Sequence, residues 1–347
     1  MRIGIYTDVH CCYTSSIMPL HNSESKYTTR LQMIVDTFSW MYDVFDNNSV
    51  DLIINCGDLF DSHNIRAEEI CAMSDALSFG GQIPEFHILG NHEIVDNNRT
   101  FYANGLLSRC DHIQLVDQPL KLSNGISLLP YMPWQQATEV LPLLSNKYLF
   151  SHIDIKGSNV TPTHALTDGV DPTKLSDLFT IVVNGHLHSP QSWGNKIFNI
   201  GSTTSLSFSD NSDYNPRISI LDTNTNTFEF FDNPYAIRFV KLAVQDMSDL
   251  STQLSKPYSM ILRIQCSSAL KPEVDQLLAD SGNVIASRIQ LTDAHINTSS
   301  ADKANTDQLN AESSVMQQFH DFLDGYSELK YPKEDYFAVL RELEAKS

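Results

Sequence analysis

The sequence predicts an α/β fold with two packed sheets, followed by a smaller α+β module. Three observations predict it: strands and helices alternate at the start of the chain, a long series of strands follows, and the pattern shifts after Asn233-Pro234. The 347 residues exceed what one core comfortably needs. We therefore expect one large and one small domain.

The first part of the chain alternates between two periodicities. Short apolar runs predict strands, and apolar residues at helical spacing predict helices. The strands are Ile3–Thr7, Asp51–Asn55 and Glu85–Leu89, and the helices are Tyr27–Phe45 and Ala67–Ser78. Open α/β sheets bind ligands at the carboxyl ends of their strands.

The middle of the chain is rich in strands, which indicates a second sheet packed on the first. The expected strands are His112–Val116, Ile126–Tyr131, Lys147–His152, Ile181–Asn184, Lys196–Ile200, Arg217–Asp222 and Phe228–Asp232. An Asn/Thr turn joins the last two.

Asn233-Pro234 marks a boundary, and the pattern changes from Arg238. Residues 236–295 predict a small module, with strands Phe239–Val244, Ser259–Gln265 and Val284–Leu291 and a helix at Pro272–Asp280. Residues 296–347 begin with a Ser/Asn/Thr/Asp-rich linker. Two short amphipathic helices follow it, at Val315–Phe322 and Tyr336–Leu343. We therefore expect a domain over 1–235, a module over 236–295 and a C-terminal segment.

Four short motifs occur at strand ends in one order: TDVH, CGDLFD, LGNHE and NGHLH. Each alone is a weak signal, since a lone Asp is usually a turn residue or helix cap. Together, and with His152 at the end of a later strand, they predict a site for two divalent metals. Residues two apart in an extended segment point the same way. Asp8 and His10 can therefore reach one ion, and His186 and His188 lie on one side of their segment. The predicted ligands are Asp8, His10, Asp58, Asn91, His152, His186 and His188.

The other histidines lack this context. We interpret most as surface or core residues and leave His63 open; they are His21, His63, His87, His112, His164, His295 and His320.

These motifs resemble those of the calcineurin-like metallophosphoesterases. The resemblance covers residues 1–235 and implies a four-layer α-β-β-α sandwich with a small C-terminal α+β capping domain. Gly57–Asp61, Ser151–Gly157 and the added module more loosely resemble the SbcD-type DNA repair nuclease subunit, including phage recombination endonuclease subunits.

The resemblance implies an assignment of ligands. Asp8, His10 and His188 would hold one ion, and Asn91, His152 and His186 the other, with Asp58 as the bridge. A set of nitrogen, carboxylate and amide ligands suits manganese, with magnesium, iron or zinc as alternatives. Two such ions about 3.5–4 Å apart acidify a water for attack on phosphorus.

Two neighbouring residues have open roles. By resemblance His92 protonates or stabilises the leaving oxygen, and its alternative role is to orient Asp58 or a metal ligand. Asp61 stands where some relatives carry a second active-site histidine, and His63 lies two residues further on.

The expected function is that of a DNA nuclease in repair, recombination or replication, exonucleolytic on duplex ends or endonucleolytic on single strands. Such relatives act with an SbcC-type ATPase, for which the last helices are a docking candidate; alternatively these helices only complete the core. A homodimer through Asn22–Phe45 and Ala67–Ser78 is also implied. The alternative functions are a phosphoesterase for monoesters, cyclic nucleotides or phosphoproteins, and a non-catalytic scaffold, against which the full ligand set argues.

Charge and composition limit the alternatives. The net charge of −19 argues against binding nucleic acid by bulk electrostatics alone, although two divalent ions add about four positive charges. The sequence contains no run of about 18 apolar residues, so we expect no membrane-spanning helix. The N-terminus lacks the pattern of a signal peptide and the six cysteines show no CxxC spacing, so we expect a cytoplasmic protein with free thiols.

Overall fold

A computed structural model describes residues 1–14, 18, 25–81, 83–95, 107, 111–161, 164–210 and 214–292. The chain divides into two compact units, Met1–Thr292 and Asp293–Ser347. The predicted linker and C-terminal helices lie outside the described residues. No helix in the described ranges is both long enough and apolar enough to cross a membrane.

The first sheet has the strand order β14-β13-β1-β2-β3-β4. Its parallel strands are β1 (Arg2–Tyr6), β2 (Leu52–Asn55), β3 (Glu85–Ile88) and β4 (Ile113–Val116). The antiparallel strands β13 (Arg217–Asp222) and β14 (Thr227–Asp232) extend it beyond β1. All six strands were predicted from the sequence to within two residues at each end.

The second sheet has the order β11-β12-β10-β7-β6-β5. Its parallel strands are β6 (Ile126–Leu129), β7 (Tyr148–Ser151), β10 (Ile181–Asn184) and β12 (Ile197–Asn199). The antiparallel edge strands β5 (Leu120–Lys121) and β11 (Gln191–Trp193) are short. Strands β8 (Asn159–Thr161) and β9 (His164–Ala165) form a separate two-stranded sheet.

The two sheets pack face to face because their strands are apolar on both sides. In β1, Ile3 and Ile5 belong to the cluster between the sheets, where they meet Tyr148 and Phe150 of β7. Tyr6 points the other way, toward the helices. This alternation follows from the two-residue period of a strand, and buried parallel strands are typically apolar on both faces.

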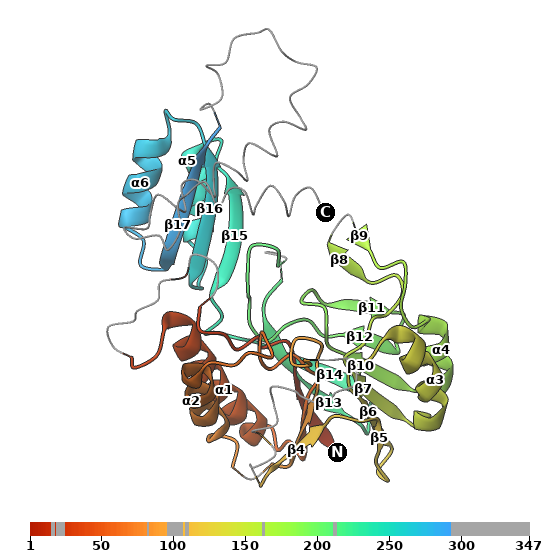
Figure 1. Ribbon diagram of the computed structural model, residues 1–347. Coiled ribbons are helices and arrows are strands. Elements are labelled where there is room, and N and C mark those ends of the chain that lie inside the picture. Colours follow the sequence, from red (N-terminus) through yellow and green to blue (C-terminus); the bar gives the residue numbers. More distant parts are fainter. Residues whose placement is uncertain are drawn as a thin grey trace, which may run out of the picture. The chain divides into compact units, whose positions relative to one another are not determined.

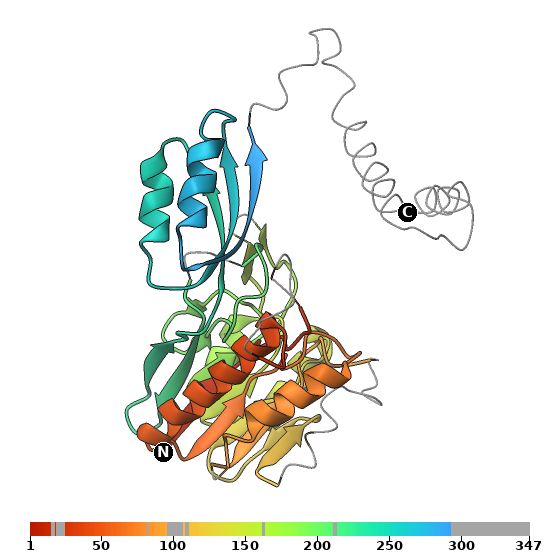
Figure 2. The same ribbon diagram turned by 90° about the vertical axis from the view of Figure 1, so that its left-hand side faces the viewer.

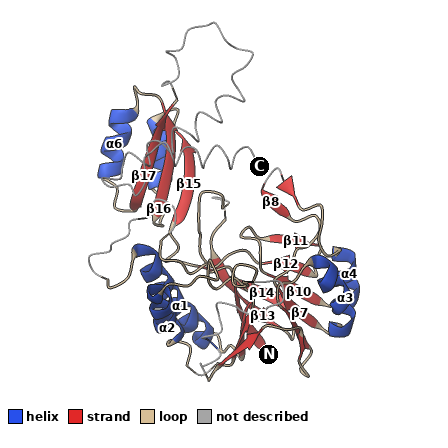
Figure 3. Ribbon diagram, in the orientation of Figure 1, coloured by secondary structure: helices blue, strands red, loops and turns tan. Residues whose placement is uncertain are grey.

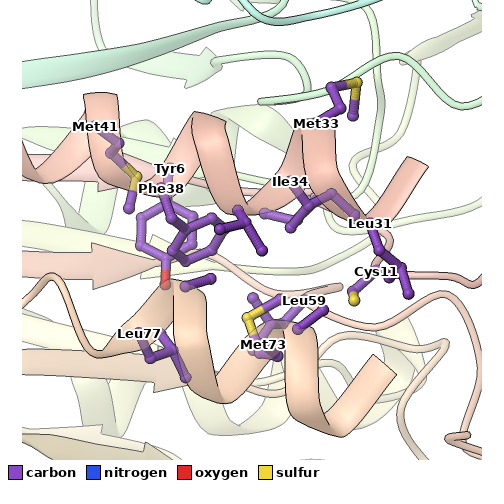
Figure 4. Packing of buried hydrophobic residues seen from close by; sticks show 14 of the residues in the cluster. Tyr6, Cys11, Leu31, Met33, Ile34, Phe38, Met41, Leu59, Met73 and Leu77 are labelled. Atoms are coloured by element: carbon purple, nitrogen blue, oxygen red, sulfur yellow. The ribbon is translucent and has the colours of Figure 1, made fainter. Parts of the chain in front are cut away.

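Helices cover both outer faces and complete four α-β-β-α layers (Figures 1 and 2). On the first sheet lie α1 (Thr29–Asn47) and α2 (Ala67–Leu77), and on the second lie α3 (Trp134–Leu144) and α4 (Pro172–Leu178). Figure 4 shows Phe38 and Ile34 of α1 above Met73 and Leu77 of α2. The predicted four-layer architecture is confirmed.

A three-stranded parallel sheet follows this sandwich. It consists of β15 (Arg238–Ala243), β16 (Met260–Cys266) and β17 (Val284–Leu291), with α5 (Met247–Leu254) and α6 (Lys271–Ala279) as its connections. Both helices lie on one face of this sheet (Figure 3). The sequence predicted α6 but not α5, which is eight residues long and buries only Leu250 completely.

Candidate metal centre

The four motifs meet where the parallel strands of both sheets end. Asp8 and His10 follow β1, Asp58 follows β2, and Asn91 follows β3. From the second sheet, His152 follows β7, and His186 and His188 follow β10. The structure therefore brings all seven predicted ligand residues to one edge of the sandwich.

The backbone is strained at this edge. Of the six non-glycine residues with positive φ in the described ranges, four are predicted ligands: Asp8 (51°), His10 (47°), Asp58 (53°) and His186 (81°). Such conformations are uncommon outside glycine and cost about 1–3 kcal/mol each. They concentrate at functional sites, where the surrounding structure holds them in place.

Glycines allow the motif loops to approach one another. A Cβ on Gly90 would lie 2.0 Å from Oδ1 of Asp58, and one on Gly185 would lie 2.3 Å from Oγ1 of Thr7. Gly57 has φ of 105°, and a Cβ there would lie 2.3 Å from Nδ1 of His152. A side chain at any of these three positions would displace a neighbouring motif.

Asp8, His10 and His188 form the first group of converging atoms. Nε2 of His10 lies 2.9 Å from Nε2 of His188 and 3.9 Å from Oδ1 of Asp8. Oδ2 of Asp8 accepts hydrogen bonds from Oγ1 of Thr7 and the backbone N–H of His186. Oδ1 of Asp8 is buried and has no hydrogen-bond partner in the described structure. A buried carboxylate oxygen without a donor is costly unless a cation lies beside it.

Asn91, His152 and His186 form the second group. Oδ1 of Asn91 lies 3.1 Å from Nε2 of His152 and 3.0 Å from Nδ1 of His186. The two ring nitrogens lie 3.3 Å apart.

Asp58 stands between the two groups and is almost completely buried. Its Oδ2 lies 3.2 Å from Nε2 of His152 and 3.8 Å from Nε2 of His10. Its Oδ1 accepts a hydrogen bond from the backbone N–H of His92 (3.1 Å). Asp58 is therefore placed to bridge two ions.

In each of the four histidines, one ring nitrogen points toward the converging ligand atoms and the other points away; we call them the inner and the outer nitrogen. Each outer nitrogen lies within hydrogen-bonding distance of an oxygen. Nδ1 of His10 lies 3.1 Å from Asp61, Nδ1 of His188 lies 2.7 Å from Asp210, and Nε2 of His186 lies 2.9 Å from Asp154. Nδ1 of His152 donates to the carbonyl of Cys56 (2.7 Å). Since these oxygens only accept, the outer nitrogens carry the protons and the inner nitrogens keep their lone pairs.

In both groups, hydrogen-bond acceptors therefore lie about 3 Å from one another without a proton between them: the inner histidine nitrogens and the Asn91 oxygen. A cation between such acceptors stabilises this arrangement. Without a metal, a proton can supply that charge. Burial lowers the pKa of His152, but the Asp58 carboxylate outweighs burial and raises that pKa to about 9. The donor set and its geometry therefore fit two divalent metals.

The sequence did not identify the outer carboxylates of Asp154 and Asp210. Asp154 lies two residues after His152, where the same spacing argument would have found it. Asp210 lies in a loop with no such signal. Asp61 was noted only as a departure from a family pattern, and the structure places it beside His10.

His92 is exposed at the mouth of the site, with its ring centroid 4.8 Å from that of His10. Its Nδ1 donates to the carbonyl of Asp61 (2.8 Å). The backbone N–H of His92 orients Asp58, so both roles considered for this residue are compatible with the geometry. His63 is exposed and belongs to none of the ligand groups among the described residues.

Two buried charged residues hold the motif loops. The Glu93 carboxylate accepts from the backbone N–H groups of Leu59 (2.7 Å) and Gly90 (2.9 Å), which joins the second and third motifs. The Arg30 guanidinium is fully buried and donates to the carbonyls of His10 (3.0 Å) and Ser205 (2.7 Å). Neither role was predicted from the sequence.

The sequence matches the family described as calcineurin-like phosphoesterase over residues 1–190. This match covers more than half of the chain, and the fold and the converging motifs agree with it. The protein belongs to the calcineurin-like phosphoesterase family, whose members depend on two metal ions.

Individual relatives are more distant. The chain is 22% identical over 232 residues to a candidate phosphoesterase, 244L, of Invertebrate iridescent virus 6, which covers 62% of this chain and 78% of that protein. It is 27% and 31% identical to the DNA double-strand break repair protein Mre11 of Sulfolobus acidocaldarius and Sulfurisphaera tokodaii. Those alignments cover 50% and 46% of this chain, and 48% and 44% of the archaeal proteins.

Among solved structures, the chain resembles a dimetal phosphatase from Danio rerio, with 14% identity and a TM-score of 0.38. That alignment covers 63% of this chain and 91% of the phosphatase.

Proposed function

We propose that this protein is a two-metal-dependent DNA nuclease that hydrolyses phosphodiesters in recombination, repair or replication. The observation that carries this proposal is the pair of donor groups around Asp58, which fits two adjacent divalent ions. The similarity to archaeal Mre11 proteins favours DNA as the substrate.

In this proposal Asp8, His10 and His188 would hold one ion, Asn91, His152 and His186 would hold the other, and Asp58 would be shared between them. Bound manganese would supply Lewis acidity and would lower the pKa of the attacking water. Asp61, Asp154 and Asp210 keep the histidine tautomers that ligation needs. His92, exposed and 4.8 Å from the ring of His10, is placed to protonate the leaving oxygen of a substrate.

The test is the degradation of DNA with defined ends by the full chain in Mn²⁺, with Mg²⁺, Fe²⁺ and Zn²⁺ as comparisons. End-labelled linear duplex and circular single-stranded DNA separate exonuclease from endonuclease activity. We expect cleavage that EDTA abolishes and that Asp58→Asn reduces at least about 10³-fold, because the bridge is lost.

The alternative substrate class is a phosphomonoester, cyclic nucleotide or phosphoprotein, which the acidic charge of the chain favours mildly. Hydrolysis of p-nitrophenyl phosphate without any cleavage of DNA would establish this alternative. Cleavage of neither class by metal-loaded protein would contradict the catalytic proposal.

The proposed partners are an SbcC-type ATPase and a second copy of the chain. For the homodimer, α2 and its end expose two apolar side chains, Ile70 (36%) and Phe79 (49%). Light scattering of the full chain, with and without Ile70→Ser and Phe79→Ser, tests the dimer. Co-purification with a coexpressed ATPase of this type tests the other partner.

A further inference from the structure

Three cations lie in register across the sheet of the C-terminal module. Lys241 of β15 pairs with Arg263 of β16, and Arg263 pairs with Arg288 of β17. Adjacent strands lie about 4.8 Å apart, so the three residues form one row across the sheet. We call Lys241, Arg263 and Arg288 the cation row.

Helices α5 and α6 lie on one face of this sheet (Figure 1). The cation row lies on the opposite face. Val240 and Leu262 pack against those helices, so Lys241 and Arg263, one residue further along, point to the opposite face. Lys241 and Arg288 are exposed, and Arg263 is partly exposed.

The row has no ion-pair partner in the described part of the chain. None of its three residues forms an ion pair or a side-chain hydrogen bond with another described residue. Arg263 instead stacks over the ring of Phe208, 4.3 Å from its centroid. Like charges opposite one another on adjacent strands are destabilising. Three neighbouring cations on a chain of net charge −19 indicate a surface that binds an anion.

The surroundings of the row suit a phosphate group. A cavity of about 420 Å³ is lined, among the described residues, by Arg263, Arg288, Ile289 and Gln290. Gln265 pairs with Gln290 in the next row, where the two amides are hydrogen-bonded (3.4 Å). Guanidinium groups bind phosphate oxygens in a fork, and neighbouring amides can add further donors.

One residue of the row contacts the loop that leads to the candidate metal centre. Phe208, on which Arg263 stacks, lies two residues before Asp210, whose carboxylate holds Nδ1 of His188. Phe208 also packs edge-on against Phe239 of β15, with ring centroids 5.2 Å apart. A ligand on the row would therefore lie on the same side of the module as the loop that carries Asp210.

We propose that the cation row binds the phosphodiester backbone of a nucleic-acid strand outside the metal centre. This inference rests on the proposed function, since the strand is the substrate of that site. Three cations on adjacent strands span about 10 Å, which is longer than a single phosphate group and favours an extended polyanion. The row supplies locally the positive charge that the acidic chain lacks overall.

The test is binding of a fluorescent 20-nucleotide single strand and the matching duplex to the full chain, measured by anisotropy in EDTA over a range of salt. Without metal no strand is cleaved, so binding and catalysis are measured separately. We expect Lys241→Gln/Arg263→Gln/Arg288→Gln to weaken binding about tenfold or more. The slope of log K against log salt should decrease by about 2 for the single strand, because three phosphate contacts are lost.

The matched control is Lys121→Gln/Lys147→Gln/Lys196→Gln. These three lysines are exposed on the second sheet and its loops, and their loss changes the net charge by the same amount.

Lys241→Gln/Arg288→Gln, which keeps the Arg263 stack on Phe208, should lose part of the affinity with an unchanged melting temperature. Equal weakening by the row and control variants would overturn the proposal. So would an unchanged salt slope in the row variants. Failure of the chain to cleave DNA would overturn only the proposed function.

Discussion

Nε2 of His10 and Nε2 of His188 lie 2.9 Å apart, although 178 residues separate the two histidines in the sequence. The opposite nitrogen of each ring faces a carboxylate, Asp61 for His10 and Asp210 for His188. Each carboxylate accepts a hydrogen bond from Nδ1, so the ring proton is on Nδ1 and not on Nε2. Two lone pairs therefore face each other, which is favourable only when a cation lies between them.

The first prediction concerns Asp210, which acts on the metal only through His188. Its Oδ1 lies 2.7 Å from Nδ1 of His188, and its Oδ2 accepts from the backbone N–H groups of Leu206 and Ser207. Asp210→Asn should lower Mn²⁺ affinity at one site by about 10–100-fold, because the ring loses its orientation and basicity. Calorimetric titration of the metal-free protein measures this loss site by site.

Asp168 supplies the control, since it is exposed and belongs to none of the ligand groups among the described residues. Asp168→Asn changes the net charge equally and should leave both sites intact. Unchanged Mn²⁺ titrations in Asp210→Asn would show that this carboxylate does not support the metal.

The second prediction uses the close approach of two motif loops. A Cβ on Gly90 would lie 2.0 Å from Oδ1 of Asp58 and 2.4 Å from its backbone nitrogen. Gly90→Ala should therefore displace the bridging carboxylate and remove both metal occupancy and activity. A Cβ on Gly81 would have no atom within 4 Å, so Gly81→Ala should behave as the unmodified chain. Metal content by mass spectrometry compares the two variants, and full occupancy in Gly90→Ala would refute the packing argument.

The third prediction separates catalysis from ligation at His92. The ring is exposed, and its Nδ1 donates to the Asp61 carbonyl. His92→Asn should retain both metals and lose about 10²–10⁴-fold in kcat, the range typical of a general acid. Asp8→Ala and His186→Ala should instead lose metal. If His92→Asn also lost its metal, the residue would have a structural role.

Much of this site could be predicted because its information is local. A ligand that follows an apolar run lies at a strand end, and a parallel sheet brings its strand ends to one edge. Asp8, Asp58 and Asn91 could therefore each be predicted as ligands from the short sequence around one strand end.

Residues that act across the fold carried no such signal. Asp210 reaches His188, and Arg30 reaches the His10 carbonyl, only after the chain has folded. Helix α3 was missed because Pro142 lies inside it, and proline usually ends a helix. Its packing on the second sheet through Ala137 and Leu141 outweighs that penalty.

The last prediction concerns a buried polar cluster formed by β1, β3 and α1. The carboxylate of Glu85 accepts hydrogen bonds from the hydroxyls of Tyr6 (2.6 Å) and Tyr42 (2.8 Å) and from Nε2 of His87 (2.7 Å). Burial raises the pKa of Glu85, but His87 and these hydrogen bonds outweigh burial and hold the pKa below its ordinary value.

A depressed pKa makes stability depend on pH with a definite sign. The unfolded chain protonates Glu85 near pH 4.3, above the pKa in the folded chain, so its contribution is complete at pH 7 and is lost as pH falls below about 4.3. Glu85→Gln should lower the free energy of unfolding by about 2 kcal/mol at pH 7, and by less at pH 3.5. Tyr42→Phe, which removes one donor and keeps the carboxylate, should cost about 1 kcal/mol and retain most of the pH dependence. Urea denaturation of the three chains at both pH values measures these differences. An equal loss in Glu85→Gln at pH 7 and pH 3.5 would mean that Glu85 contributes packing and not charge.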